Sequence, residues 1–152
     1  MPQSLSNVLV HIVYSTKNRK PWLKDSGIRN ELYAYNASIL KDIVDSPALL
    51  IGGVEDHIHI LLLLSRKHAI MDVVQQSKTE TSKWIKKQGA QYHDFQWQAG
   101  YGAFSVSQSK SEQVKQYIAN QEDHHRTMSF QDEFRKICDR HGITIDERYV
   151  WD

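Results

Sequence analysis

The apolar residues of the chain recur with two different periods, and these predict an alternation of strands and helices. Segments rich in Val, Ile and Leu predict strands at residues 7–14, 49–54 and 57–64, and a short strand at 103–106. Apolar residues at helical spacing predict helices at 28–43, 69–87, 109–125 and 130–140. Ser109 followed by Glu112 predicts a capping box, Ser129 a second helix cap and Gly142 a helix stop. The last ten residues are predicted to be extended.

This order of elements indicates the fold class. A β-α-β-β-α-β sequence followed by helices is typical of an α+β, ferredoxin-like (RRM-like) antiparallel sheet with helices packed on one face. We expect residues 1–126 to form this domain, and residues 127–152 to add a C-terminal helix and tail to it. The fold alone hosts many functions and assigns none.

The composition is that of an ordinary globular chain, with 40% hydrophobic and 24% charged residues in 152. The longest apolar run, Ile60 to Leu64, is far shorter than the roughly 20 residues that span a bilayer. The N-terminus shows neither a basic leader nor a cleavage site. A single cysteine, Cys138, fits a reducing compartment. We therefore expect a cytoplasmic protein without a membrane partner.

The net charge of +1 hides an asymmetry along the chain. Up to Gln121 there are 14 Lys and Arg against 10 Asp and Glu, whereas from Glu122 onward there are 5 against 8. Basic residues gather at 17–24 and again at 78–87. Such clusters can bind phosphates in a nearly neutral protein, or they can be solvated surfaces.

His57 and His59 lie two residues apart in a predicted strand, so both side chains point to the same face. Two imidazoles on one rigid face can supply two ligands of a metal site. The alternative is a pair of partly buried histidines at a sheet edge. Polar residues inside an otherwise apolar strand carry a desolvation cost, which favours a functional role.

Tyr117 and Gln121 lie four residues apart in a predicted helix, one turn above the other. A phenol has a pKa near 10 and needs a cation or a base to act as a nucleophile. A metal held by His57, His59 and the Gln121 oxygen could polarise a phosphate within reach of Tyr117. The alternative is an aromatic residue at the edge of the core beside a solvated glutamine.

Four ordered segments give the sequence a family resemblance: HIVYSTKNRKP, EDHIHIL, FQWQAGYGAFSVS and VKQYIANQEDHH. Together they resemble the single-tyrosine transposases of the insertion sequence 200/605 family, which belong to the HUH nucleases. The resemblance covers nearly the whole chain. It implies the same ferredoxin-like fold that the periodicity predicts, and a homodimer in which Tyr117 acts in its own subunit or in its partner.

The resemblance also implies an activity. Tyr117 would attack a phosphodiester of single-stranded DNA near hairpin ends, leaving a 5′-phosphotyrosine and a free 3′-hydroxyl. His57, His59 and Gln121 would be the ligands of Mg²⁺ or Mn²⁺, and no small-molecule cofactor is implied. The chain would thus be a metal-dependent DNA strand transferase and endonuclease.

Such an enzyme needs cations for phosphates and aromatic side chains for unpaired bases. The candidate DNA-binding residues are Lys17, Arg19, Lys20, Lys83, Lys86, Lys87, Trp97 and Tyr101. Core packing is the favoured role for Phe104 and Cys138, and His11 is expected to be a satisfied sheet histidine. His124 and His125 are adjacent, so they cannot both face the site.

Three other functions remain open. A domesticated, repeat-associated relative would keep the site. A non-catalytic module would bind single-stranded nucleic acid through surface aromatics and leave His57 and His59 without a role. A hydrolytic phosphodiesterase would use water as the nucleophile and survive the loss of Tyr117.

Overall fold

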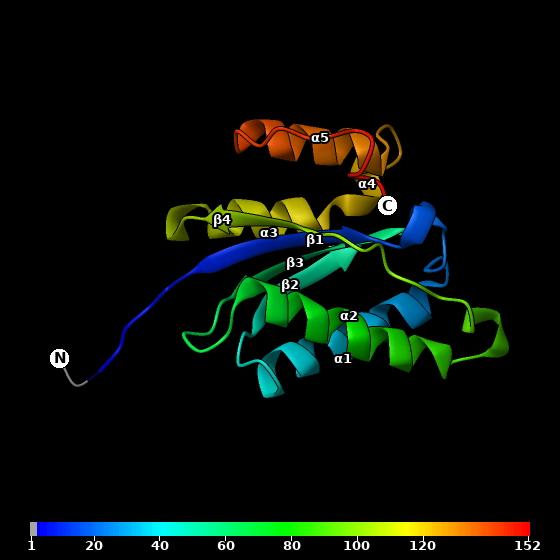
Figure 1. Ribbon diagram of the computed structural model, residues 1–152, viewed down its shortest axis with the longest axis horizontal. Helices are drawn as coiled ribbons and strands as arrows, with labels where there is room; N and C mark the ends of the chain where they lie inside the picture. Colours follow the sequence, from blue (N-terminus) through cyan, green and yellow to red (C-terminus); the bar gives the residue numbers. More distant parts are fainter. Residues whose placement is uncertain (1–2) are drawn as a thin grey trace.

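The computed structural model describes residues 3–152 and places four strands in one antiparallel sheet (Figure 1). The strands are β1 (Leu9–Ser15), β2 (Ala48–Gly53), β3 (His57–Leu63) and β4 (Gly102–Val106). Their order is β2-β3-β1-β4, so β1 and β3 are central. Every neighbouring pair is antiparallel. The predicted α+β class with an antiparallel sheet is confirmed.

Helices cover both faces of this sheet. Helices α1 (Ser26–Asp42) and α2 (Ile70–Lys86) lie side by side on one face (Figure 1). On the other face lie α3 (Ser111–Ala119), α4 (Gln121–His124) and α5 (Phe130–Arg140). Short 3-10 turns occupy Lys17–Arg19, Ala90–Tyr92 and Gln108–Lys110. Among residues 3–152, no helix is both long and apolar enough to cross a membrane.

The two faces of the central strands carry different residues, because neighbouring residues of a strand point to opposite faces. Ile58, Ile60 and Leu62 of β3 join the large apolar core beneath α1 and α2. His57, His59 and Leu61 point to the opposite face, beneath α3, α4 and α5. This alternation delivers the two histidines to the C-terminal helices.

The C-terminal segment is anchored to the same sheet. Phe130, Phe134 and Ile137 of α5 form one apolar cluster with Val13 of β1 and Phe104 of β4. Cys138 is buried in this cluster, and the predicted packing roles of Cys138 and Phe104 are confirmed. Helix α5 therefore lies over β1 and β4, beside the histidine-bearing strand.

Three local predictions are wrong or need adjustment. The capping box at Ser109 is wrong: α3 begins at Ser111, after a 3-10 turn, and Lys110 at its N-cap provides no side-chain hydrogen bond. The helix predicted at 109–125 is interrupted at Asn120, whose φ of −96° and ψ of 19° are not helical. The tail is not fully extended, because residues 147–151 form turns.

The two ends of α5 lie where the sequence predicts them. Ser129 caps α5 by accepting a hydrogen bond from the Asp132 N–H. Gly142 follows α5 with a φ of +68°, a conformation that glycine adopts without strain. Both predicted end signals of this helix are confirmed.

Candidate active site

Strand β3 holds His57 and His59 on the face covered by the C-terminal helices. Both side chains are fully buried. In the sheet, His59 lies opposite Val13 and His57 opposite Ser15. Because β3 is a central strand with neighbours on both sides, the backbone at these two positions is fixed by ladders of hydrogen bonds. The pair is therefore held rigidly inside the molecule and not at a sheet edge.

Helix α3 brings Tyr117 over the same face. At Gly52 of β2, an added Cβ would lie 2.7 Å from the carbonyl oxygen of Ile118, so a glycine is needed for α3 to approach β2 this closely. This approach places the ring of Tyr117 with its centroid 5.8 Å from that of His59. The tyrosine side chain is half-buried and lies beside the histidine pair.

The interruption at Asn120 turns Gln121 into the same cluster. Gln121 begins α4 and is 1% exposed. Its Oε1 lies 3.0 Å from His57 Nε2. His57, His59, Tyr117 and Gln121 therefore meet at one place within a single chain, although Tyr117 and Gln121 lie on two helices and not on the single helix predicted for them.

Glu133 of α5 lies at the centre of this cluster, although none of the four sequence motifs includes it. Its Oε1 lies 3.2 Å from the Nε2 atoms of both His57 and His59. Its Oε2 accepts hydrogen bonds from the Tyr117 hydroxyl and, at 2.7 Å, from Gln121 Nε2. The side chain is only 2% exposed. One buried carboxylate thus contacts all four residues that the sequence singled out.

His125 is the second addition to the site. Its Nε2 lies 3.0 Å from Glu133 Oε1 and 3.1 Å from Gln121 Oε1. The adjacent His124 lies against the ring of Tyr117 instead, with ring centroids 4.7 Å apart. As expected for neighbours on a helix, only one of the two histidines points into the cluster.

Each inward-facing histidine is oriented by a contact on its other ring nitrogen. His57 Nδ1 lies 2.7 Å from Asp56 Oδ1, and His125 Nδ1 lies 2.6 Å from the Met128 carbonyl oxygen. His59 Nδ1 lies 2.8 Å from His11 Nε2. Outer contacts of this kind fix the ring orientation of histidines that bind metals. His11 is a satisfied sheet histidine, as predicted, and it supports His59.

The charges of the cluster are strongly coupled. Burial alone would raise the pKa of Glu133, but hydrogen bonds from His125, His57 and His59 hold that pKa far below its usual value. Burial would lower the pKa of His57, yet hydrogen bonds with Asp56 and Glu133 raise it to about 9. Burial lowers the pKa of His59. Glu133 is therefore an anion that the surrounding rings must neutralise.

Tyr117 is held as a neutral phenol in this arrangement. Burial raises its pKa, and the negative charge and hydrogen bond of Glu133 raise it further. Beside the ring lies a cavity of about 260 Å³ between α3 and α5, which connects the phenol to the surface. Arg140, His11 and His141 are among its lining residues. An anionic group entering this cavity would meet both the phenol and Arg140.

The donors of the cluster fit a divalent metal. One ligand atom each from His57, His125 and Glu133 lie within 4.8 Å of one another. Gln121 Oε1 lies within 3.1 Å of both histidine Nε2 atoms. Imidazole nitrogens together with carboxylate and amide oxygens suit Mn²⁺, and Mg²⁺ less well, because Mg²⁺ prefers oxygen.

The predicted DNA-binding lysines fall into two separate groups. Lys17 and Lys20 flank the turn after β1, which is joined to the start of β3 by the 2.8 Å hydrogen bond from Thr16 N to Asp56 O. Arg19 is in the same turn, but its guanidinium donates to the Trp151 carbonyl. Lys83, Lys86 and Lys87 are exposed near the end of α2, on the opposite face of the sheet from Tyr117. The structure does not bring this second group to the site.

The two aromatic candidates also differ. Trp97 is buried in the large apolar core, and its indole N–H donates to Thr81 Oγ1 at 3.0 Å. Its ring therefore has no free face on which a base could stack, which contradicts that prediction. Tyr101 is 39% exposed and remains a candidate. The segment FQWQAGYGAF does not itself show which of its aromatic rings the helices cover.

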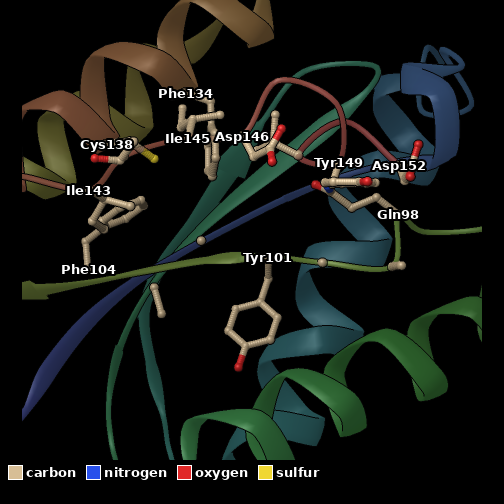
Figure 2. Close-up of a pocket in the computed structure, with 16 residues that line it drawn as sticks. Gln98, Tyr101, Phe104, Phe134, Cys138, Ile143, Ile145, Asp146, Tyr149 and Asp152 are labelled. Carbon is tan, nitrogen blue, oxygen red and sulfur yellow. The ribbon is translucent and has the colours of Figure 1, made fainter.

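Tyr101 lines a larger cavity, of about 780 Å³, away from the histidines. Figure 2 shows the tail residues Ile145, Asp146 and Tyr149 along one side of it, while Tyr101 points away from the tail. Phe104 also lines it, and none of the residues of the histidine cluster does. This cavity therefore belongs to the packing of the tail on β4 and is separate from the chemistry.

A sequence signal for Glu133 does exist. Phe130, Phe134 and Ile137 mark the buried stripe of α5, and Glu133 falls within that stripe. A carboxylate on the apolar side of an amphipathic helix requires a partner inside the protein. The partners, however, lie far away in the sequence: Glu133 is 74 residues from His59.

The fold and this cluster define a class of protein: an α+β sheet that presents two histidines from a central strand and a tyrosine from a helix packed over them. Similarity to known proteins identifies the family within this class. Residues 4–121 match the family of IS200-like transposases, and the chain belongs to that family. The match ends at Gln121, before His125 and Glu133.

Two solved structures are similar to the chain. A protein of Deinococcus radiodurans R1 described as a transposase is 23% identical with a TM-score of 0.53, over 78% of this chain and 93% of that one. A REP-associated tyrosine transposase bound to a REP hairpin is 10% identical with a TM-score of 0.61, over 81% of this chain and 71% of that one. At these identities the two structures support the fold. No curated protein is significantly similar to the chain.

Proposed function

We propose that this transposase cleaves and rejoins single-stranded DNA at hairpin-containing ends through a 5′-phosphotyrosine intermediate on Tyr117. The observation that carries the proposal is the placement of the Tyr117 hydroxyl in a cluster with His57, His59 and Gln121. Membership of a transposase family supports a DNA-processing activity. The resemblance of the sequence to single-tyrosine enzymes supports the choice of nucleophile.

In this mechanism the scissile phosphate enters the cavity beside Tyr117, where Arg140 provides a positive charge. The Tyr117 oxygen forms a bond to phosphorus while the bond from phosphorus to the 3′-oxygen breaks. The phenol proton leaves to water in the cavity, because the strongly stabilised Glu133 carboxylate is a weak base, and the departing 3′-oxygen takes a proton from water. The covalent bond to Tyr117 conserves the energy of the phosphodiester, so the strands can be rejoined by the reverse steps.

A divalent metal, when bound, would supply Lewis-acid stabilisation of the phosphate. The resemblance assigns His57, His59 and Gln121 as its ligands, with Mg²⁺ or Mn²⁺ as the ion. The described geometry supports a metal in this place, because nitrogen and oxygen donors converge there. His57 and Gln121 point directly at each other, and His59 points at Glu133.

Recognition of a hairpin end is supported by the solved relative that was bound to a REP hairpin. Lys17 and Lys20 are exposed beside the start of β3 and could contact the phosphates of such a hairpin. The same relative favours a second candidate function, in which this chain is a domesticated, repeat-associated transposase. A homodimer is proposed on the resemblance alone. The position of Tyr117 beside the histidine cluster of its own chain favours action in cis.

The decisive experiment incubates the full chain and its Tyr117→Phe variant with labelled single-stranded DNA and Mn²⁺. The DNA carries hairpins from the sequence flanking the gene. We expect a covalent protein–DNA adduct on Tyr117, detected by denaturing gel and mass spectrometry. The Tyr117→Phe variant, or the wild type with a chelator, should form at least about a thousandfold less adduct. Tyr149→Phe is a matched control, since Tyr149 is exposed.

The other outcomes separate the alternatives. Cleavage that persists in Tyr117→Phe without an adduct would identify a hydrolase. Tight binding of the hairpin with neither cleavage nor adduct would identify a binding module. Cleavage only at hairpins outside any mobile element would favour the domesticated relative.

A further inference from the structure

The histidine cluster contains a mismatch of hydrogen-bonding groups. His57 Nδ1 faces a carboxylate oxygen of Asp56, and His125 Nδ1 faces a backbone carbonyl oxygen. Both oxygens are acceptors, so both Nδ1 atoms must donate. If the rings are neutral, each Nε2 then carries a lone pair and no proton.

The inward sides of the same two rings face acceptors as well. His57 Nε2 lies 3.0 Å from Gln121 Oε1 and 3.2 Å from Glu133 Oε1. His125 Nε2 lies 3.1 Å and 3.0 Å from the same two oxygens. The amide orientation of Gln121 is set by its Nε2, which donates to Glu133 Oε2 at 2.7 Å. Lone pairs therefore face lone pairs at four contacts, and a positive charge must lie among them.

His59 does not share this requirement. Its Nδ1 can accept a hydrogen bond from His11 Nε2 while its own Nε2 donates to Glu133 Oε1. Both contacts are satisfied by a neutral ring. The need for a cation is thus confined to the four atoms that His57, Gln121, His125 and Glu133 point at one another.

Two kinds of positive charge could meet this need: one proton on each ring, or one divalent metal ion. The four atoms, two imidazole nitrogens and two oxygens, are all buried or nearly so, and they converge from β3, the α4 segment and α5. The outer contacts on both Nδ1 atoms hold the rings in the orientation that metal binding requires. A metal ion would satisfy all four atoms together and balance the buried carboxylate.

We propose that His125 and Glu133 are additional ligands of the divalent metal, which they bind together with His57 and Gln121. The proposal rests on the metal-dependent function proposed above and extends it, because both residues lie beyond the segment that matches the family. His59, which the resemblance also assigns as a ligand, lies 3.2 Å from the same Glu133 oxygen, but its contacts are satisfied without a cation, so the new assignment rests on His57, Gln121, His125 and Glu133. Helix α5 thereby becomes part of the metal site, and Glu133 Oε2 links that site to the Tyr117 hydroxyl.

The test measures Mn²⁺ binding to the full chain by isothermal titration calorimetry, without DNA. We expect Glu133→Gln and His125→Asn each to weaken Mn²⁺ binding at least about tenfold. Matched controls are Asp139→Asn, an exposed acid on the same helix, and His93→Gln, an exposed histidine far from the cluster; both should bind like the wild type. His57→Asn should weaken binding whether or not α5 contributes.

A second measurement shows that each variant is folded. Thermal unfolding is followed with EDTA and then with Mn²⁺, since a ligand that binds only the folded state raises its Tm. Wild type and the control variants should show the Mn²⁺ shift, and Glu133→Gln should lose most of it. If Glu133→Gln does not fold in EDTA, Glu133→Asp replaces it, because its shorter side chain withdraws the carboxylate while keeping the charge.

Two results would overturn the proposal while leaving the proposed function intact. Unchanged Mn²⁺ affinity in both Glu133→Gln and His125→Asn, with weakened binding in His57→Asn, would leave the metal to the family's ligands alone. If Glu133→Gln bound Mn²⁺ more tightly than the wild type, the Glu133 carboxylate would hinder metal binding and would not be a ligand. If wild type binds neither Mn²⁺ nor Mg²⁺, both this proposal and the metal in the proposed function fail.

Discussion

The two faces of the sheet carry very different chemistry, although the same strands build both. The face beneath α1 and α2 is covered mainly by apolar side chains, with Ile12, Ile58, Ile60 and Leu62 in one continuous core. The opposite face buries the rings of His11, His57 and His59 together with Glu133 and Gln121. Alternation along each strand lets one face provide most of the stability while the other holds a polar cluster.

The difference between the two faces explains how charged side chains can be buried beneath α3, α4 and α5. Glu133, His57 and His125 lie together, so protons on the rings or one metal ion can balance the buried carboxylate, whereas any one of these groups alone would carry a large desolvation cost. The face beneath α1 and α2 holds no such cluster of charges: its buried polar groups, such as the hydrogen-bonded Tyr14, Ser77 and Asn36, are neutral, and most of its side chains contribute through apolar packing. Changes on the two faces should therefore differ in what they alter: stability on one, chemistry and pH dependence on the other.

The largest effect on stability is expected on the apolar face. Ile60 is 1% exposed, and Ile60→Ala should lower the free energy of unfolding by about 2–5 kcal/mol through lost burial and a residual cavity. Urea denaturation measures the loss, with Met71→Ala at an exposed position as the control. Adduct formation per folded molecule should not change. If Ile60→Ala lowered the free energy of unfolding by less than about 1 kcal/mol, the face beneath α1 and α2 would not be the main source of stability.

An intermediate effect is expected from pH on the polar face of the metal-free protein. The folded-state pKa of His57 is raised to about 9, so its contribution is fully present below pH 6.5 and is lost as the pH rises through 9. This corresponds to about 3 kcal/mol. The pKa of His11 is lowered to about 3 by burial and by His59, so His11 acts oppositely and removes stability below pH 6.5.

Stability in EDTA should therefore be greatest near pH 6.5 and fall toward pH 9. Urea denaturation at several pH values tests this expectation. His57→Gln should abolish the alkaline decline while keeping the acidic one. An equal decline in wild type and His57→Gln would assign the pH dependence to other groups.

The smallest effect is expected from replacing surface lysines, which tests whether DNA binds to only one face of the sheet. If Lys17 and Lys20 contact phosphates, replacing both by Ala should reduce the slope of log K against log salt by about 1.4 for single-stranded DNA. Lys83→Ala with Lys86→Ala should leave the slope unchanged, because α2 lies on the other face. Equal reductions in the two double variants would show that DNA contacts both faces.

Much of the fold is predictable because it depends on local periodicity. The alternation in HIHILLL identifies a strand with two inward histidines, and the spacing of Tyr117 and Gln121 predicts that both point the same way. The broken helix and the wrong cap at Ser109 are not predictable from spacing. Both are imposed by the packing of α3 against β2 and of Gln121 into the histidine cluster.

The site is predictable only in part, for a similar reason. His57, His59, Tyr117 and Gln121 belong to short motifs that a sequence displays directly. Glu133 shows only as an acid within the apolar stripe of α5, and its partners are distant in sequence. The burial of Trp97 and the separation of Lys83 from the site also depend on which face each element covers.

Local pattern is sufficient for the order of the elements, the antiparallel α+β class and the shared face of His57 and His59. These follow from side-chain periodicity, which the local backbone geometry fixes. Tertiary packing is needed to bring α5 over the polar face and Glu133 into the cluster with His125. Those contacts join segments far apart in the chain, and long-range packing, not local spacing, selects them.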